Sequence, residues 1–383
     1  MTRALLLVLV AGCTPDPGPP TVTAGWNPHT EPVAPAEAAV TSVDLASRGD
    51  ELALAWTQRV DDRDQLHIAR WSPGGPLEQG IVPSEDVVVG LARRPSVALS
   101  ADGTVSVSFT TGDPRASTWW LATVADTPDA AELRVIAEAA ADAVPTLLDQ
   151  PEVRIAPDGE RWLLAKAEVD HPTVELWLAR EGEDFAPTAL RPFPGRPCEC
   201  CPHQLDFTPG GDALLTIRND EDNIREIWTA RAEAGTAAFQ RTAQVSTTAW
   251  FVPGCPFDGP RMTATRDPFL SVVWVDAATG VALPYLARSE DGGATWASEV
   301  RVLADRGTAY AFPQIADDGR TTWVAAEELW DGVQVDRDDG TGWTPVTVPH
   351  VRRDGELLVT EGGDDASPDC SMDEPCASIR EAM

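Results

Sequence analysis

Lysine is almost absent from this chain. Lys166 is the single lysine among 29 basic residues, and 61 acidic residues bring the formal net charge to −32 over 383 residues. A field of that sign repels nucleic acid and anionic lipid head groups, so we expect no nucleic-acid partner. It also disfavours an anionic ligand unless arginines gather locally. Acidic residues spread over a large surface for solubility explain the charge most simply.

Long apolar runs and long helical patterns are also missing. No stretch reaches the length of about 18 apolar residues that a transmembrane helix needs. The 33 prolines and 29 glycines require frequent turns. Hydrophobic residues make up 43% of the chain, enough for a sizeable core. The length fits either two average domains or one large all-β domain.

The N-terminus has the pattern of an export signal. Arg3 precedes a short apolar run that ends in Val10-Ala11-Gly12-Cys13. This sequence resembles the lipobox of bacterial lipoproteins, in which small residues admit the peptidase and the cysteine thiol carries the lipid. The resemblance implies a signal peptide at residues 1–12 and lipidation, with palmitate, at Cys13. An ordinary signal peptide followed by an incidental cysteine is the alternative.

Residues 13–38 are polar and rich in proline, which predicts an extended tether between the lipid and the folded domain. We therefore expect an exported protein that is anchored by its lipid in the cell envelope. In a Gram-negative bacterium the anchor would lie at the outer membrane or the periplasmic face.

Seven cysteines are present, and lipidation of Cys13 would leave six, an even number that suits disulfides in an oxidising compartment. Cys370 and Cys376 lie close together in an acidic tail, residues 361–383, where we expect them to close a small loop.

Four cysteines remain in the middle of the chain: Cys198, Cys200, Cys201 and Cys255. They allow either two disulfides, at least one of which joins the 198–201 loop to Cys255, or a thiolate metal site. C-x-C-C is not a standard zinc spacing, and only His203 lies beside the cluster. The prediction is therefore disulfides, with no metal and no other cofactor assigned.

A pattern of strands and turns recurs about every 45–55 residues from residue 40 onward. Each copy begins with a short apolar strand, usually followed by a D-G or G-G turn. The strands that open the six copies are Val43–Leu45, Pro95–Leu99, Pro151–Ile155, Gln204–Phe207, Pro260–Ala264 and Pro313–Ala316.

The third strands of five copies also agree, because each is apolar and ends in Ala-Arg or a related pair. They are Leu66–Arg70, Trp119–Ala122, Leu176–Arg180, Ile227–Arg231 and Tyr285–Arg288. Repeated four-stranded units of this length fit the blades of a propeller, in which closure hides the sheet edges. We predict an all-β, six-bladed β-propeller over residues 39–360, with 14 tryptophans packed mainly between blades. Residues 343–360 either complete the ring or pair with the N-terminal strand.

One turn matches a known motif at every defining position: Ser289, Asp291, Gly293, Thr295 and Trp296. It resembles the Asp box, or BNR repeat, of the sialidase-like β-propellers. There the polar side chains close a β-turn by hydrogen bonds to backbone, and the tryptophan packs beneath it. The resemblance implies a propeller of the sialidase type and a structural role for these five residues.

A second resemblance covers residues 198–296. The C-x-C-C motif is followed by R-N at 218–219, R-E at 225–226, Trp250 and C-P-F-D-G at 255–259. This order resembles a group of bacterial exported sialidase-like propellers that has no settled activity. It implies fold and export more than a reaction.

A working exo-sialidase would need three arginines that clamp the substrate carboxylate. It would also need a tyrosine nucleophile, a glutamate that takes the tyrosine proton, and an aspartate that acts as the general acid–base. The family's early F/Y-R-I-P motif is missing, and Arg93-Arg94-Pro95 is a poor substitute. The residues that could serve are Tyr310, Glu327 or Glu328, Arg218 and Arg225. Tyr285, the other tyrosine, lies in a strand before the Asp box, so we expect a structural role for it.

Loops 198–203, 218–226 and 250–260 are expected to meet at the axial face, with Trp250 and Asp258 as ligand contacts. Alternatively, their disulfides only fasten two blades together. The leading hypothesis is a monomeric, membrane-anchored propeller that binds a glycan or other extracellular ligand at the axial face, with no catalysis established and enzyme activity left open. A sialidase-type glycoside hydrolase, and a thiolate metal or redox site at the cysteine cluster, are the alternatives.

Overall fold

The computed structural model describes residues 39–49, 51–60, 63–72, 78–82, 94–112, 117–127, 130–140, 144–170, 173–193, 195–254, 256, 258–303, 309–317, 319–328, 332–346, 350–351 and 357–358. The predicted signal peptide, lipidated Cys13, the tether, Cys255 and the Cys370–Cys376 loop lie outside these residues and stay predictions. No helix in the described part of the chain is long and apolar enough to cross a membrane.

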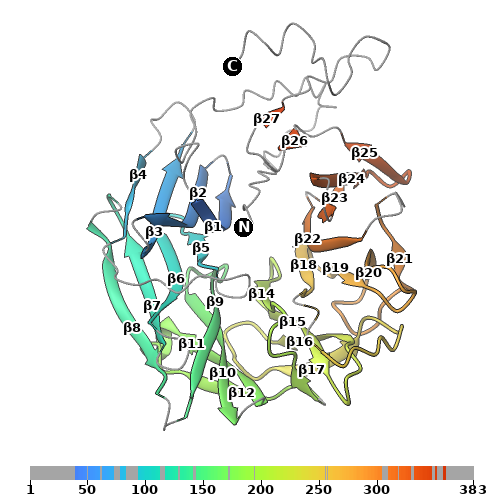
Figure 1. The fold of residues 1–383 in the computed structure, drawn as a ribbon, viewed down its shortest axis with the longest axis horizontal. Helices are drawn as coiled ribbons and strands as arrows, with labels where there is room; N and C mark the ends of the chain where they lie inside the picture. The colour runs from blue at the N-terminus through green and yellow to red at the C-terminus, as the bar shows by residue number, and fades with distance from the viewer. Residues whose placement is uncertain are drawn as a thin grey trace, which may run out of the picture.

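Six antiparallel sheets follow one another around a ring in chain order, each with four consecutive strands (Figure 1). Blades 1 to 3 contain β1 (Ala39–Arg48), β2 (Glu51–Val60), β3 (Arg63–Trp71) and β4 (Glu78–Ile81); β5 (Ser96–Leu99), β6 (Val105–Thr111), β7 (Thr118–Val124) and β8 (Glu132–Glu138); and β9 (Leu147–Ile155), β10 (Arg161–Asp170), β11 (Thr173–Arg180) and β12 (Thr188–Leu190). A short 3-10 turn, η2 (Glu181–Glu183), follows β11. The chain is therefore a six-bladed propeller, as its repeats predict.

Blades 4 to 6 contain β14 (Gln204–Phe207), β15 (Ala213–Asp220), β16 (Ile227–Ala232) and β17 (Gln240–Gln244); β18 (Arg261–Arg266), β19 (Phe269–Asp276), β20 (Leu283–Ser289) and β21 (Val300–Arg301); and β22 (Tyr310–Asp317), β23 (Thr322–Glu328), β24 (Gly332–Asp338) and β25 (Trp343–Val346). Blade 4 also holds β13 (Arg196–Pro197), which pairs with the end of β15. Because β25 is the fourth strand of blade 6, residues 343–346 complete the last blade. A separate pair follows, β26 (His350–Val351) with β27 (Leu357–Leu358).

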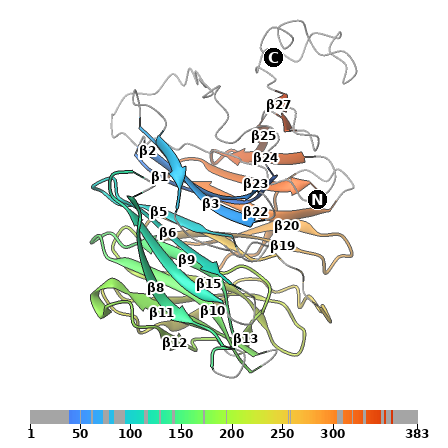
Figure 2. The ribbon, with the colours of Figure 1, turned by 60° about the vertical axis from the view of Figure 1, so that its left-hand side comes forward.

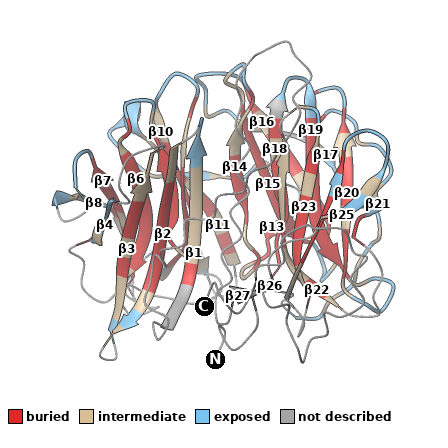
Figure 3. Ribbon diagram, turned by 90° about the horizontal axis from the view of Figure 1, so that it is seen from above, coloured by how far each residue is buried: buried red, intermediate tan, exposed pale blue. Residues whose placement is uncertain are grey.

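The apolar cores lie between neighbouring blades, where the faces of two sheets pack together. Figure 2 shows β22 to β24 stacked over β19 and β20 in this way. Trp119, Trp162 and Trp274 are at most 1% exposed and sit in three successive interfaces. Buried residues occupy the middle of the strands and exposed residues the connecting turns (Figure 3). These three tryptophans therefore pack between blades, as predicted.

A ladder of side-chain hydrogen bonds links the inner strands around the axis. In each step, a polar side chain on one inner strand accepts from a backbone N–H on the next: Asp44 from Val97 at 2.9 Å, Ser96 from Val153 at 3.2 Å, Glu152 from Leu205 at 2.9 Å and Gln204 from Met262 at 2.7 Å. Inner strands are sheet edges, and these bonds satisfy donors that would otherwise be unpaired near the axis. The ladder fixes the register of one blade against the next.

The turn after β20 is closed by its own side chains. Asp291 accepts hydrogen bonds from the backbone N–H of Thr295 at 2.8 Å and from its hydroxyl at 2.6 Å. The Ser289 hydroxyl donates to Asp291 and accepts from the N–H of Gly293, both at 2.8 Å. The hydrogen bonds from Thr295 lower the pKa of Asp291 to about 2. Trp296 packs against the core between blades 4 and 5, so the turn is a structural feature of the periphery.

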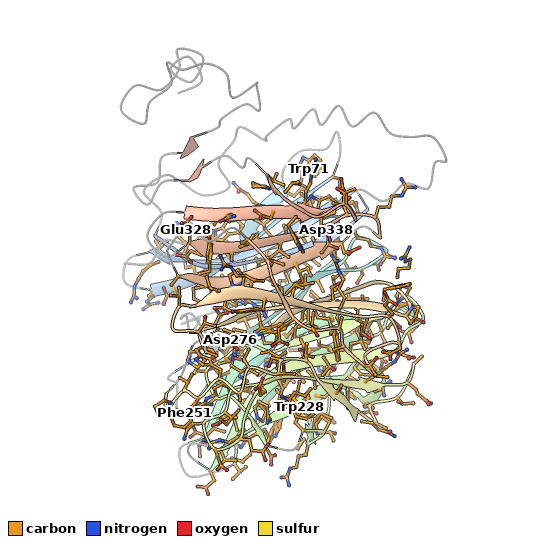
Figure 4. The ribbon with its side chains drawn as sticks, turned by 90° about the vertical axis from the view of Figure 1, so that its right-hand side faces the viewer. Trp71, Trp228, Phe251, Asp276, Glu328 and Asp338 are labelled. Carbon is orange, nitrogen blue, oxygen red and sulfur yellow. The ribbon has the colours of Figure 1, made fainter. Side chains whose placement is uncertain are left out.

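The two faces of the ring differ in which strands end there. Figure 4 shows Glu328 at the end of β23, Asp276 at the end of β19 and Phe251 toward one side, and Asp338 at the end of β24 toward the other. We call the first side the start face, because the inner strands begin there. The loops that precede β14 and β18 lie on it and carry the residues described next.

Candidate functional site

Three loops of blades 4 and 5 meet on the start face, as the sequence predicts. β13 pairs with the end of β15, and the N–H of Cys198 donates to the Arg218 carbonyl at 2.9 Å, so the cysteine loop crosses blade 4. The N–H of Arg225 donates to the carbonyl of Trp250, also at 2.9 Å. These backbone bonds hold loops 198–203, 220–225 and 246–260 together.

Gly259 marks the closest approach between two of these loops. A β-carbon at this position would lie 1.9 Å from the carbonyl oxygen of Pro202. No side chain fits there without displacing backbone, so only glycine permits this contact. The glycine of the C-P-F-D-G motif therefore has a steric function, which is to seat the loop of Pro202 and His203 at the axis.

Arg218 and Arg225 are scaffold residues by their contacts. Arg218, 1% exposed, donates to three carbonyls, those of Asp258 at 2.8 Å, Arg225 at 3.0 Å and Val275 at 2.6 Å. Arg225, 2% exposed, donates to the carbonyl of Gly254 at 2.9 Å and pairs with Asp220 at 2.9 Å. These contacts fasten blades 4 and 5, and because every nitrogen of the Arg218 guanidinium already donates to a backbone carbonyl, Arg218 is not free to clamp a ligand carboxylate.

Trp250 and Asp258, predicted as ligand contacts, join the same scaffold. The guanidinium of Arg218 stacks over the Trp250 ring, 5.0 Å from its centroid. Asp258 is 5% exposed, and one carboxylate oxygen accepts from the N–H of Phe312 at 3.1 Å. Burial raises the pKa of Asp258 to about 7. Asp258 thus joins three blades, while Phe251, next to Trp250, is 59% exposed.

Tyr310 and Glu327 come from blade 6. Tyr310 is 1% exposed in the core between blades 5 and 6, and its hydroxyl donates to Gln334 at 2.6 Å. Glu327 is half-buried on β23. A nucleophile has to reach the anomeric carbon of a sugar, and a hydroxyl enclosed in a core cannot do so. The other tyrosine, Tyr285, packs against the same core.

The cysteine loop holds two buried thiols beside a disulfide. Cys198 and Cys201 are free and at most 1% exposed, so the disulfides predicted for these two cysteines are wrong. Cys200 is disulfide-bonded to a residue outside the described part. The Cys198 and Cys200 sulfurs lie 3.9 Å apart. A hydrogen bond from Cys201 lowers the pKa of Cys198, and burial raises that of Cys201. Loss of one proton from the two thiols is therefore easier than loss of both.

The single lysine of the chain lies beneath this loop. Lys166, 2% exposed on β10, donates to the carbonyls of both Cys198 and Cys201. Burial lowers the pKa of its ammonium group. A buried cation is costly unless several acceptors surround it. The two carbonyls of the cysteine loop are such acceptors, so Lys166 and this loop conformation stabilise each other.

A small cavity lies on the axis, and two of its lining residues, Pro202 and His203, directly follow the cysteine loop in the chain. It has a volume of about 30 Å³ and is lined by residues of five blades: Asp44, Arg94, Ser96, Gln150, Pro151, Glu152, Arg154, Pro202, His203 and Arg261. Such a volume holds one or two water molecules or a single carboxylate group. Three arginines face two carboxyl groups here, although the whole chain is strongly acidic.

Two lining residues carry buried polar atoms without partners. Both ring nitrogens of His203 and both side-chain amide atoms of Gln150 lack a hydrogen bond among the described residues. The His203 side chain is 2% exposed, and burial holds its pKa well below the usual value, so the ring is neutral. Because nearly all buried polar groups in proteins are paired, these four atoms indicate a place for a polar guest.

Glu152 is the acidic group that controls the charge of the cavity. It pairs with Arg154 at 2.8 Å and accepts from Leu205, yet burial raises its pKa to about 7. Near neutral pH it is therefore close to half protonated. The three arginines outnumber the two carboxyl groups even when Glu152 is ionised, and protonation of Glu152 below that pH adds one more unit to the excess of positive charge that an anion site requires.

Sequence reasoning did not find the cavity residues. A signal was present, because Asp44, Ser96, Glu152, Gln204 and Arg261 each stand directly before an apolar residue in the opening strand of a copy. Alignment of the six copies would have put this polar column on one side of every inner strand, facing the axis. It would not have shown that His203 is buried, since that depends on Gly259.

No family model matches the chain, and no curated protein matches it either. Among solved structures, it is similar to the periplasmic gluconolactonase of Pseudomonas aeruginosa, with 18% identity, coverage of 82% of this chain and 86% of that one, and a TM-score of 0.51. The Aleuria aurantia lectin has 10% identity, coverage of 82% and 96%, and a TM-score of 0.49. The α-L-arabinofuranosidase of Fusarium graminearum has 12% identity, coverage of 77% and 90%, and a TM-score of 0.48. At 18% identity, the likeness to the gluconolactonase supports the propeller fold alone.

Proposed function

We propose that this protein is an exported propeller, anchored by lipid at Cys13, that binds an anionic glycan through the axial cavity. The observation that carries the proposal is the group of unpartnered atoms on His203 and Gln150, set among Arg94, Arg154 and Arg261. A carboxylate fits the cavity volume, and the sugar ring that bears it would remain outside.

Charge supports an anion over a neutral sugar. Arginine binds carboxylates through paired donors, and a cationic cavity in an acidic molecule concentrates anions at that one place. The neutral His203 ring and the Gln150 amide add donors without adding charge. An acidic sugar such as a uronate or sialate therefore suits the site best.

We propose binding without sialidase-type hydrolysis. That chemistry would need Tyr310 at a substrate, but its side chain is 1% exposed and bonded to Gln334. The Asp-box resemblance of the 289–296 turn supports a sialidase-like ancestry for the scaffold. It adds nothing to the case for catalysis, because the turn lies at the periphery.

Ligand-observed NMR on the purified protein tests the proposal. Glucuronate and N-acetylneuraminate are expected to show saturation transfer, and galactose is not. A fluorogenic sialoside should show no turnover at high protein concentration. Equal signals from all three sugars, or none from either acid, would refute the anion site. Turnover that disappears in Tyr310→Phe would restore the hydrolase alternative.

A further inference from the structure

The two buried thiols of the cysteine loop form a donor set of their own. Cys198 and Cys201 are separated by two residues, a spacing common to metal-binding and redox pairs. The sulfurs of Cys198, Cys200 and Cys201 all lie within 4.8 Å of one another. Because Cys200 is held in a disulfide, only Cys198 and Cys201 are available as thiolate ligands among the described residues.

The donors decide which ion could bind. In the described part of the chain, no histidine nitrogen or carboxylate oxygen belongs to this group of sulfurs. Zinc requires four ligands, whereas thiolates alone suit soft ions such as Cu(I). Two metal–sulfur bonds of about 2.3 Å placed end to end span about 4.6 Å. Because the two sulfurs are no more than 4.8 Å apart, both can reach a single ion bound between them.

The surroundings compensate the charge of such a complex. A monovalent ion with two thiolates carries one net negative charge, which is costly to bury alone. Lys166 holds the carbonyls of both cysteines, and Arg218 and Arg225 are close enough to act electrostatically on Cys198. Because Arg225 is already paired with Asp220, Lys166 and Arg218 give the anionic complex its counter-charge. They also explain why the only lysine of the chain is buried here.

We propose that Cys198 and Cys201 bind one Cu(I) ion in a two-coordinate site, independently of the axial cavity. Two Cu–S bonds form as the two S–H bonds break, both protons pass to solvent, and the ligands that carried the Cu(I) are released. The copper stays Cu(I), no oxidant or reductant is consumed, and the Cys200 disulfide remains intact. Lys166 acts as a positioning residue, because it donates hydrogen bonds to the backbone carbonyls of Cys198 and Cys201.

The test uses the full-length chain with Cys13, Cys370 and Cys376 changed to Ser. The cysteines that remain are then Cys198, Cys200, Cys201 and Cys255. Cu(I) is supplied as its bicinchoninate complex with ascorbate, which leaves disulfides intact. We expect one copper per chain, and copper-edge X-ray absorption that shows two sulfur neighbours. Cys198→Ser and Cys201→Ser should each lose this copper while circular dichroism shows a folded protein.

Several results would overturn the proposal. One is absence of copper uptake by the background chain, and another is uptake that survives both serine variants. A third is an intact mass showing that Cys198 and Cys201 are already oxidised to each other. If a serine variant fails to fold, the sulfur count from X-ray absorption on the background chain decides, and nitrogen or oxygen neighbours would contradict the site. None of these results bears on sugar binding, so the two proposals fail separately.

Discussion

At the scale of single residues, Gly259 offers a sharp test of how the site is built. Gly259→Ala would drive a methyl group into the Pro202 carbonyl, and neither backbone can move without displacing the other. We expect a loss of roughly 1–3 kcal/mol in the free energy of unfolding, together with weaker ligand binding. Urea denaturation measures the first quantity.

Gly254→Ala is the matched control for this substitution. A β-carbon at Gly254 would meet nothing within 4 Å, although the residue lies in the same loop. This variant should unfold like the wild type. Equal stability of the two variants would show that the close approach of Gly259 to Pro202 is not structurally important.

Glu152 predicts a pH dependence of stability. Its pKa is raised from 4.5 to about 7, so the folded state retains a proton that the unfolded chain releases. Stability from this group is therefore lost as pH rises from about 4.5 to 7, by roughly 3 kcal/mol. Glu152→Gln cannot ionise and should become the more stable form by about that amount at pH 8. Denaturation curves that keep the same difference at pH 4 and pH 8 would contradict this assignment.

At the scale of elements, the interblade ladder can be broken at one step. Gln204 accepts from the N–H of Met262 at 2.7 Å and donates to its carbonyl at 2.9 Å. Gln204→Ala leaves both buried groups unpaired, so we expect a loss of roughly 1–3 kcal/mol, measured by urea denaturation. Gln79→Ala, on the exposed strand β4, should change stability by less than about 0.5 kcal/mol. A Gln204→Ala variant as stable as this control would mean that the ladder contributes nothing.

The elements show where sequence reasoning succeeds. Strand periodicity and turn residues recur in each copy, so the amino-acid pattern alone is enough to place the opening strands and the third strands. The site was harder, because burial and partners depend on which loops meet. Arg218 and Tyr310 have the chemistry of a sialidase, but their packing commits both to the scaffold. The cavity depends instead on polar residues of the inner strands. No single one of them indicates a site in the sequence, and they form one only because the fold brings them together around the axis.

At the scale of the whole molecule, the acidic charge and the arginine cavity have different functions. The net charge of −32 keeps the surface soluble and repels polyanions, while the axis offers local positive charge to a small anion.

The predicted anchor also belongs to this scale. In a bacterial host, Cys13→Ala should shift the protein from the membrane fraction to the soluble fraction, because no lipid can be attached. Cys370→Ala should leave the distribution unchanged. Immunoblots of fractionated cells measure both variants, and membrane association that survives Cys13→Ala would refute lipidation as the anchor.

Calorimetric titration with glucuronate tests the central claim most directly. Arg94→Met removes one lining cation of the axial cavity, and Arg191→Met removes an arginine whose side chain is 75% exposed on blade 3. We predict that Arg94→Met weakens binding about tenfold or more, as loss of a charged hydrogen bond requires, while Arg191→Met binds like the wild type. Binding that is equal in all three proteins would contradict an anion site on the axis.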